Sequence, residues 1–174
     1  MLKHWNALLN TDCVVVDIGQ HTIYPMFCGG STSITRDCDR RYVNEQIEDC
    51  THIDVLLRDP AERYVAGVNE YCEQHGKDIK ETCRLIEHGE LANRHFAPQY
   101  VWLLHLSKFY KGDITLRPFD YIKEVTDLHV TGADRRDRVP LNESFIQVDQ
   151  QLMKYRGQTV PLVDIIKRYK NVLS

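Results

Sequence analysis

A short run of glycine and hydroxyl residues is the first part of this sequence that could do chemistry. Residues 28–33 read Cys-Gly-Gly-Ser-Thr-Ser, after an extended apolar stretch and before an expected helix. Glycines let the backbone wrap closely around an anion, and the free N–H groups at a helix start favour negative charge. The segment predicts a phosphate cradle, although the Walker A pattern G-x-x-x-x-G-K-S/T is absent. The alternative is a glycine turn followed by a capping serine or threonine.

The second candidate is an arginine at the end of an expected buried strand. Residues 52–58 are nearly all apolar and end on Arg58, after which Asp59 and Pro60 open a helix. Open α/β sheets bind ligands at the carboxyl ends of their strands. A guanidinium can bind a phosphate through two parallel hydrogen bonds. We therefore expect Arg58 to bind an anion, and the alternative is that it pairs with a local carboxylate.

These segments resemble the nucleotide-binding elements of the sulfotransferases that use 3'-phosphoadenosine 5'-phosphosulfate (PAPS). In that family a K-x-G-S-S/T-S segment holds the 5'-phosphosulfate, and residues 28–33 resemble it. An R-D-P-x-x-R-F/Y-x-S-G segment holds the 3'-phosphate, and residues 58–67 resemble it closely. Residues 94–99 resemble the H-W/F-x-P-Q segment of the carbohydrate-type branch. The resemblance covers about residues 22–130.

The resemblance implies an enzyme that transfers a sulfuryl group from PAPS to a hydroxyl or amine of a small-molecule or carbohydrate acceptor. The other product is adenosine 3',5'-bisphosphate (PAP). The implied nucleotide-binding positions are Cys28, Gly29, Gly30, Ser31, Thr32, Ser33, Arg58 and Ala66. Two of them depart from the family, because its lysine falls on Cys28 and its 3'-phosphate serine on Ala66. The alternative function is a non-catalytic descendant that acts as a nucleotide-binding or protein-interaction module.

A sulfuryl transfer also needs a base within hydrogen-bond reach of the acceptor proton. Histidine suits this role near neutral pH. His95 lies beside the Pro-Gln segment, and Glu45 and Glu48 lie between the two nucleotide-binding segments. These three residues are the candidate catalytic bases.

A zinc site is the other chemistry that the residue types allow. Its ligands would be Cys72, His75, Cys83 and His88, but only seven residues separate the two Cys/His pairs. This separation is short for a zinc finger. We therefore expect no metal.

Composition describes an ordinary globular chain, which we interpret as one domain over residues 1–174. The chain has 22 Lys and Arg, 25 Asp and Glu, a net charge of -3 and a hydrophobic fraction of 43%. This balance does not favour nucleic-acid binding, and no apolar run is long enough for a membrane helix. The six cysteines form no C-x-x-C pair, and no signal-peptide core is visible. We expect reduced thiols, a cytoplasmic microbial or viral protein, and a monomer or homodimer.

Strands and helices alternate in the expected order of elements. We expect strands at residues 13–18, 21–27, 52–58, 113–117 and 128–130, and helices at residues 32–42, 60–75, 77–88, 118–126 and 161–173. Residues 100–110 fit either a helix or a buried strand, and residues 131–142 an exposed loop. This alternation predicts an α/β fold with a mostly parallel central sheet flanked by helices. The family resemblance adds that this fold is P-loop-NTPase-like.

Overall fold

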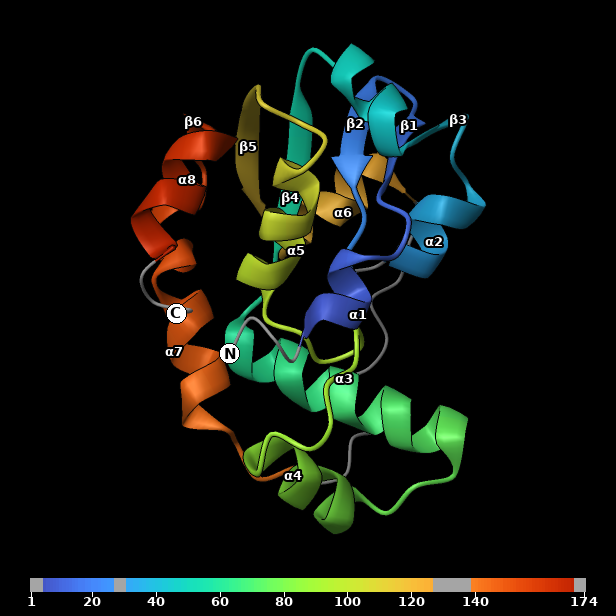
Figure 1. The fold of residues 1–174 in the computed structure, drawn as a ribbon. Helices are drawn as coiled ribbons and strands as arrows, with labels where there is room; N and C mark the ends of the chain where they lie inside the picture. The colour runs from blue at the N-terminus through green and yellow to red at the C-terminus, as the bar shows by residue number, and fades with distance from the viewer. Residues whose placement is uncertain (1–4, 27–30, 127–138, 171–174) are drawn as a thin grey trace.

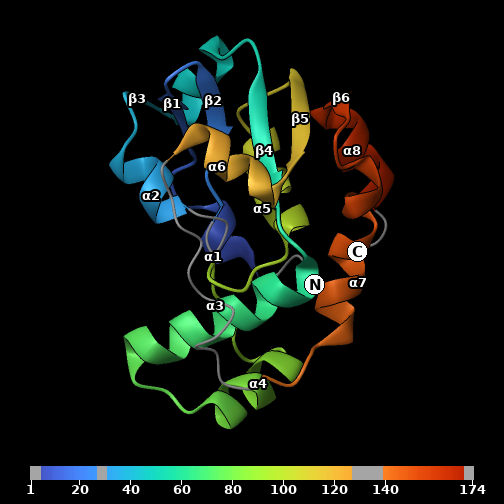
Figure 2. The ribbon, with the colours of Figure 1, turned by 180° about the vertical axis from the view of Figure 1, so that it is seen from behind.

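A six-stranded sheet with helices on both faces organises the chain. The computed structural model describes residues 5–26, 31–126 and 139–170, with residues 31–33 described by their backbone only. The strand order is β3-β1-β2-β4-β5-β6. Figures 1 and 2 show α1 and α5 on one face of the sheet and α2 and α6 on the other. The expected α/β class is confirmed.

The sheet is mixed, and the expectation of a mostly parallel sheet is wrong. Its strands are β1 (Val14–Ile18), β2 (His21–Tyr24), β3 (Arg40–Val43), β4 (Ile53–Leu57), β5 (Asp113–Pro118) and β6 (Thr159–Pro161). The β2–β4 and β4–β5 pairs are parallel, whereas β1–β2, β1–β3 and β5–β6 are antiparallel. Only Gly19 and Gln20 join β1 to β2, and a two-residue connection can join only antiparallel strands. Gly19 has φ 58°, which glycine adopts without strain.

The helices differ from expectation at α1, α2 and α7. They are α1 (Asn6–Leu9), α2 (Ser31–Arg36), α3 (Pro60–His75), α4 (Ile79–Glu87), α5 (Gln99–Ser107), α6 (Ile122–Val125), α7 (Glu143–Gln150) and α8 (Leu162–Tyr169), with 3₁₀-turns η2 (Asn44–Asp49), η3 (Phe119–Tyr121) and η5 (Leu152–Tyr155). The helix expected over residues 32–42 ends at Arg36, because residues 40–43 pair with β1 as an edge strand. Residues 100–110, which fitted a helix or a strand, form most of α5. Helices α1 and α7 were not expected.

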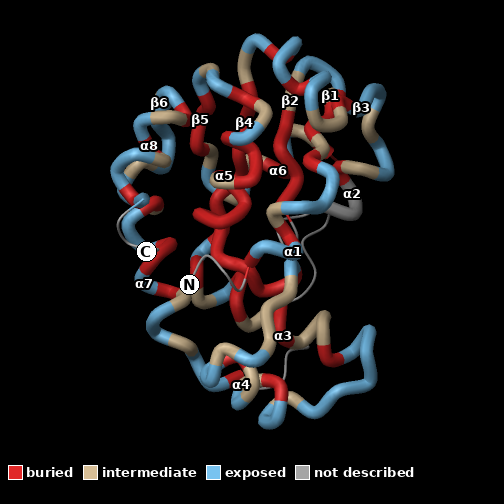
Figure 3. The backbone as a smooth tube through the Cα atoms, in the orientation of Figure 1, coloured by how far each residue is buried: buried red, intermediate tan, exposed pale blue. Residues whose placement is uncertain are grey.

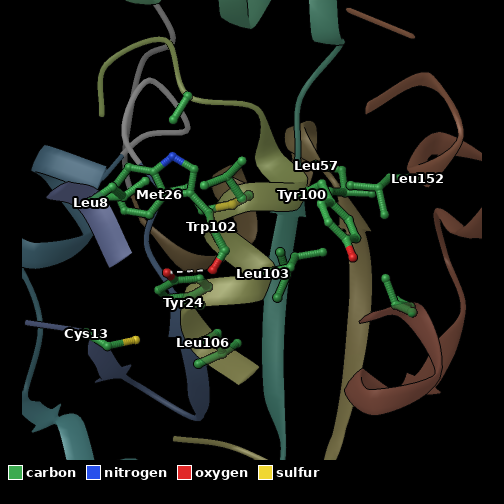
Figure 4. Close-up of a cluster of buried hydrophobic side chains, with 14 of the residues drawn as sticks. Leu8, Cys13, Tyr24, Met26, Leu57, Tyr100, Trp102, Leu103, Leu106 and Leu152 are labelled. Carbon is green, nitrogen blue, oxygen red and sulfur yellow. Dashed lines mark hydrogen bonds between the residues drawn. The ribbon is translucent and has the colours of Figure 1, made fainter. Parts of the chain in front are cut away.

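Two hydrophobic cores cover the two faces of the sheet. The larger core lies on the α5 side, where Tyr24 donates a hydrogen bond to the Trp102 carbonyl oxygen at 2.9 Å (Figure 4). The smaller core joins Leu56 of β4 to Ile34 of α2 and Ile122 of α6. Figure 3 shows the buried path along the central strands and α5. In the part of the chain that the structure describes, no helix has the length and apolarity needed to cross a membrane.

Helix α3 starts where β4 ends, and local residues fix both of its ends. The Asp59 side chain accepts a hydrogen bond from the Glu62 N–H at 2.9 Å, and Pro60 occupies the first turn, where no N–H is needed. Gly76 ends the helix with φ 60°. Arg58 is therefore held between the last strand residue and the helix cap. The expected strand at residues 128–130 and the expected loop up to residue 138 lie outside the described residues.

Candidate functional site

The carboxyl ends of β2 and β4 define the candidate site. The two strands are parallel neighbours, with Tyr24 paired to Val55, so the segments that follow them leave the sheet at the same edge. After β2 the chain continues through Pro25 and Met26, and the described residues resume at Ser31 with α2, whereas the segment after β4 begins with Arg58. Figure 1 shows α3 crossing the end of the sheet where β4 leaves it. This is the edge at which open α/β sheets bind ligands.

Arg58 is buried and has a carboxylate close to its guanidinium. Its Nε lies 3.9 Å from Oε2 of Glu62, one helical turn into α3, and its Cζ lies 5.1 Å from the centre of the Phe119 ring. The Glu62 side chain is 67% exposed, so water screens this long ion pair. The alternative of a local carboxylate partner thus has structural support. An anion that binds Arg58 has to do so beside Glu62.

The backbone of Arg58 is held by the side chain of Gln99. The Gln99 amide accepts a hydrogen bond from the Arg58 N–H and donates one to the Arg58 carbonyl oxygen, both at 3.0 Å. Gln99 is the first residue of α5 and the last residue of the 94–99 segment. The third segment of the family resemblance therefore contacts the second directly.

A buried carboxylate in turn holds the start of α5. Asp149 of α7 accepts hydrogen bonds from the N–H groups of Gln99 and Tyr100, at 2.7 and 3.0 Å. Burial raises the pKa of the Asp149 carboxyl, while the charge of Arg63 and these amide donors act in the opposite direction. Nothing in the sequence pattern around Asp149 indicated this role, because it lies fifty residues from its partners.

Two further residues of the 58–67 segment serve the packing of α3. Arg63 is 2% exposed, and its guanidinium donates a hydrogen bond to the carbonyl oxygen of Ala97. A Cβ on Gly67 would collide with the carbonyl group of His95, whose carbon would lie 2.7 Å away. Both residues therefore hold α3 against residues 93–99.

His95 is buried where Gly67 of α3 approaches its backbone carbonyl group. Its Nδ1 lies 3.7 Å from Oε2 of Glu70, and its backbone N–H donates to the Asn93 side chain at 3.0 Å. A carboxylate beside an imidazole can orient the ring. The partner Glu70 was not identified from the sequence. Only the packing of α3 against residues 93–99 brings it to His95.

The remaining nucleotide-binding positions are only partly described. Cys28, Gly29 and Gly30 lie outside the described residues. Ser31, Thr32 and Ser33 form the first turn of α2, but their side chains are not described. Ala66 lies half-buried on α3, two turns after the helix starts.

Glu45 and Glu48 lie apart from Arg58, at the opposite edge of the sheet. They belong to η2, which leads into the amino end of β4, whereas Arg58 follows its carboxyl end. A strand of five residues separates these ends by about 16 Å. Both glutamates line a surface pocket of about 450 Å³ together with Lys108. The structure therefore does not bring these two candidate bases to the candidate site.

The four candidate zinc ligands also do not converge. Cys72 donates to the Thr82 hydroxyl at 3.3 Å, and His88 contacts the Arg84 carbonyl oxygen at 2.8 Å. Over residues 5–26, 31–126 and 139–170, no group of three or more His, Cys, Asp or Glu is arranged to hold a metal ion.

Comparisons of the chain with protein-family models, curated proteins and solved structures found no match.

Proposed function

We propose that this protein binds PAPS at the carboxyl edge of β2 and β4 and transfers its sulfuryl group to a hydroxyl or amine acceptor. The observation that carries the proposal is the parallel pairing of β2 with β4, because the chain leaves β2 through Pro25 and Met26 at the edge where Arg58 follows β4. The fit to the nucleotide rests on Arg58, a buried cation at that edge whose backbone is fixed. A 3'-phosphate would bind this guanidinium in place of the exposed Glu62.

The residues of the site divide the chemistry between them. Arg58 holds the 3'-phosphate, and residues 28–33 hold the 5'-phosphosulfate. The acceptor oxygen or nitrogen forms a bond to sulfur while the bond from sulfur to the 5'-phosphate oxygen breaks. His95 takes the acceptor proton, and PAP leaves with the electron pair of the broken bond. The Glu70 carboxylate, 3.7 Å from the His95 Nδ1, orients the imidazole ring.

A second candidate function is a module that binds the nucleotide without catalysis. Cys28 and Ala66 favour it, because they stand where the resembled family has a lysine and a serine. Loss of a preorganised positive group lowers a transfer rate by on the order of 10²–10³. The two candidates share the nucleotide site and differ only in turnover.

The first test is a thermal-shift titration with PAP, with AMP as the analogue that lacks the 3'-phosphate. At a hundredfold excess over Kd, a ligand of the native state adds about 2.7 kcal/mol of stability. For a chain of this size we expect Tm to rise by roughly 5–10 °C. Arg58→Met removes the site cation, and Arg84→Met is the matched control, because Arg84 pairs with Glu81 on α4.

The proposed nucleotide site requires that PAP raises Tm more than AMP does, and that Arg58→Met but not Arg84→Met abolishes the difference. Equal shifts with PAP and AMP, or none with either, would refute it. A turnover assay with PAPS and a panel of hydroxyl and amine acceptors then separates the two functions. Turnover identifies the enzyme, whereas PAP binding without turnover identifies the non-catalytic module. Cys28→Lys should then tighten PAPS binding or restore transfer.

A further inference from the structure

The residue that fixes Arg58 is buried as completely as any in the chain. Gln99 is 0% exposed, and both ends of its amide are hydrogen-bonded to the Arg58 backbone at 3.0 Å. We propose that Gln99 is a positioning residue that gives the site its selectivity for a 3'-phosphorylated nucleotide by setting where the Arg58 guanidinium lies. This inference rests on the proposed function.

The end of β4 explains why a side chain is needed here. Leu57, the last residue of β4, is paired with Pro118, the last residue of β5, so the ladder between the two strands ends before Arg58. The next residue, Arg58, is buried, and a buried backbone group without a hydrogen bond is costly. Gln99 supplies both a donor and an acceptor at this point. The amide thus replaces the strand neighbour that the sheet does not provide.

Gln99 is itself held from two sides. Its own N–H donates to Asp149 at 2.7 Å, which ties the start of α5 to α7. Two residues earlier, the Ala97 carbonyl oxygen accepts a hydrogen bond from Arg63 of α3. The position of the Arg58 backbone is therefore set by three helices that are far apart in the sequence.

We expect Gln99 to affect the binding of the 3'-phosphate and not that of the 5'-phosphate. Arg58 lies between the Glu62 carboxylate, 3.9 Å from its Nε, and the Phe119 ring, so a small backbone shift changes which groups the guanidinium reaches. A charged hydrogen bond is sensitive to such misplacement. Both side-chain hydrogen bonds of Gln99 go to the Arg58 backbone, so the group whose position should depend on Gln99 is the one that binds the 3'-phosphate.

The test compares the affinities of PAP and AMP in Gln99→Met, which keeps the side-chain length and removes both hydrogen bonds. We expect PAP affinity to fall by about ten- to hundredfold, as for the loss of one charge-assisted hydrogen bond, while AMP affinity stays unchanged. Val101→Ala is the matched control, because it weakens the packing of the same helix at a fully buried position without touching Arg58. It should lower Tm and preserve the ratio of PAP to AMP affinity.

A second variant keeps the inference testable if Gln99→Met does not fold. Gln99→Glu retains an acceptor for the Arg58 N–H and loses the donor to its carbonyl oxygen, so the same loss of selectivity is expected. A folded variant with the wild-type ratio of PAP to AMP affinity would overturn the inference. An equal loss of affinity for PAP and for AMP would also overturn it. If the wild-type protein binds PAP no better than AMP, the proposed function fails first and the inference fails with it.

Discussion

Gly67 of α3 lies against the backbone carbonyl group of His95. A Cβ at Gly67 would collide with the carbonyl oxygen and lie 2.7 Å from the carbonyl carbon, so only glycine allows this approach. The contact fixes where His95 lies along α3, and Glu70, one turn further, meets its imidazole at 3.7 Å. The glycine at the end of the 58–67 segment therefore positions the candidate base.

We predict that Gly67→Ala destabilises the protein. In an unobstructed helix this change stabilises by about 0.5–1 kcal/mol. Here the Cβ needs α3 or the His95 backbone to move, which typically costs about 1–3 kcal/mol. After the helix gain is subtracted, the Tm should fall by up to about 10 °C, measured by differential scanning calorimetry. A Tm equal to or above that of the wild type would show that α3 does not approach His95 so closely.

We predict that Glu62→Gln strengthens PAP binding. The Glu62 carboxylate lies 3.9 Å from the Arg58 Nε, where a bound phosphate would meet its charge. An exposed charge pair is worth at most about 1 kcal/mol, so the gain in affinity should not exceed about fivefold. The unliganded protein should lose a little stability, because Glu62 lies in the first turn of α3.

Isothermal titration calorimetry measures this gain, with Glu73→Gln as the control. Glu73 is an exposed carboxylate three turns further along α3, and its removal should leave PAP affinity unchanged. Equal changes in both variants would mean that only the net charge matters.

We predict that substitution of His95 lowers turnover, whereas substitution of either glutamate of η2 does not. His95→Asn should lower turnover by roughly 10²–10⁴, the usual contribution of a general base, with PAP affinity retained. Glu45→Gln and Glu48→Gln should change neither property, because both residues lie at the opposite edge of the sheet. Loss of turnover in a glutamate variant with His95→Asn fully active would exclude His95 as the base.

We predict that acid destabilises the protein partly through His105. This residue is 1% exposed, and its Nε2 donates to the Thr11 carbonyl oxygen at 3.0 Å. Burial lowers the pKa of the His105 imidazole below its usual value of 6.5. As the pH falls below about 6.5, His105 takes up a proton in the unfolded chain more readily than in the folded chain. The free energy of unfolding therefore decreases as the pH is lowered. The slope for this single group is at most about 1.4 kcal/mol per pH unit.

His105→Gln tests this prediction, because the Gln amide can still donate to Thr11 but cannot titrate. Urea denaturation at pH 5, 6, 7 and 8 should give a flatter pH dependence for the variant than for the wild type. Parallel curves for the two proteins would show that His105 does not contribute.

Local sequence was enough to predict the elements that carry Arg58. Strand β4 follows from an apolar run, and α3 follows from the Asp59-Pro60 start and the Gly76 stop, both of which the structure shows. The antiparallel β1–β2 pair was also predictable, since two residues cannot connect parallel strands. The edge strand β3 was not, because Arg40 and Arg41 carry no apolar alternation and their strand depends on pairing with β1.

The sequence by itself determined the α/β class and an arginine at the end of a buried strand, because hydrophobic period and capping residues act over a few neighbours. The tertiary structure decided which distant groups meet that arginine. Gln99 lies 41 positions after Arg58, and Asp149 a further fifty, and their hydrogen bonds exist only once α5 and α7 pack together. It also separated Glu45 and Glu48 from the site, because a strand places its two ends at opposite edges of the sheet.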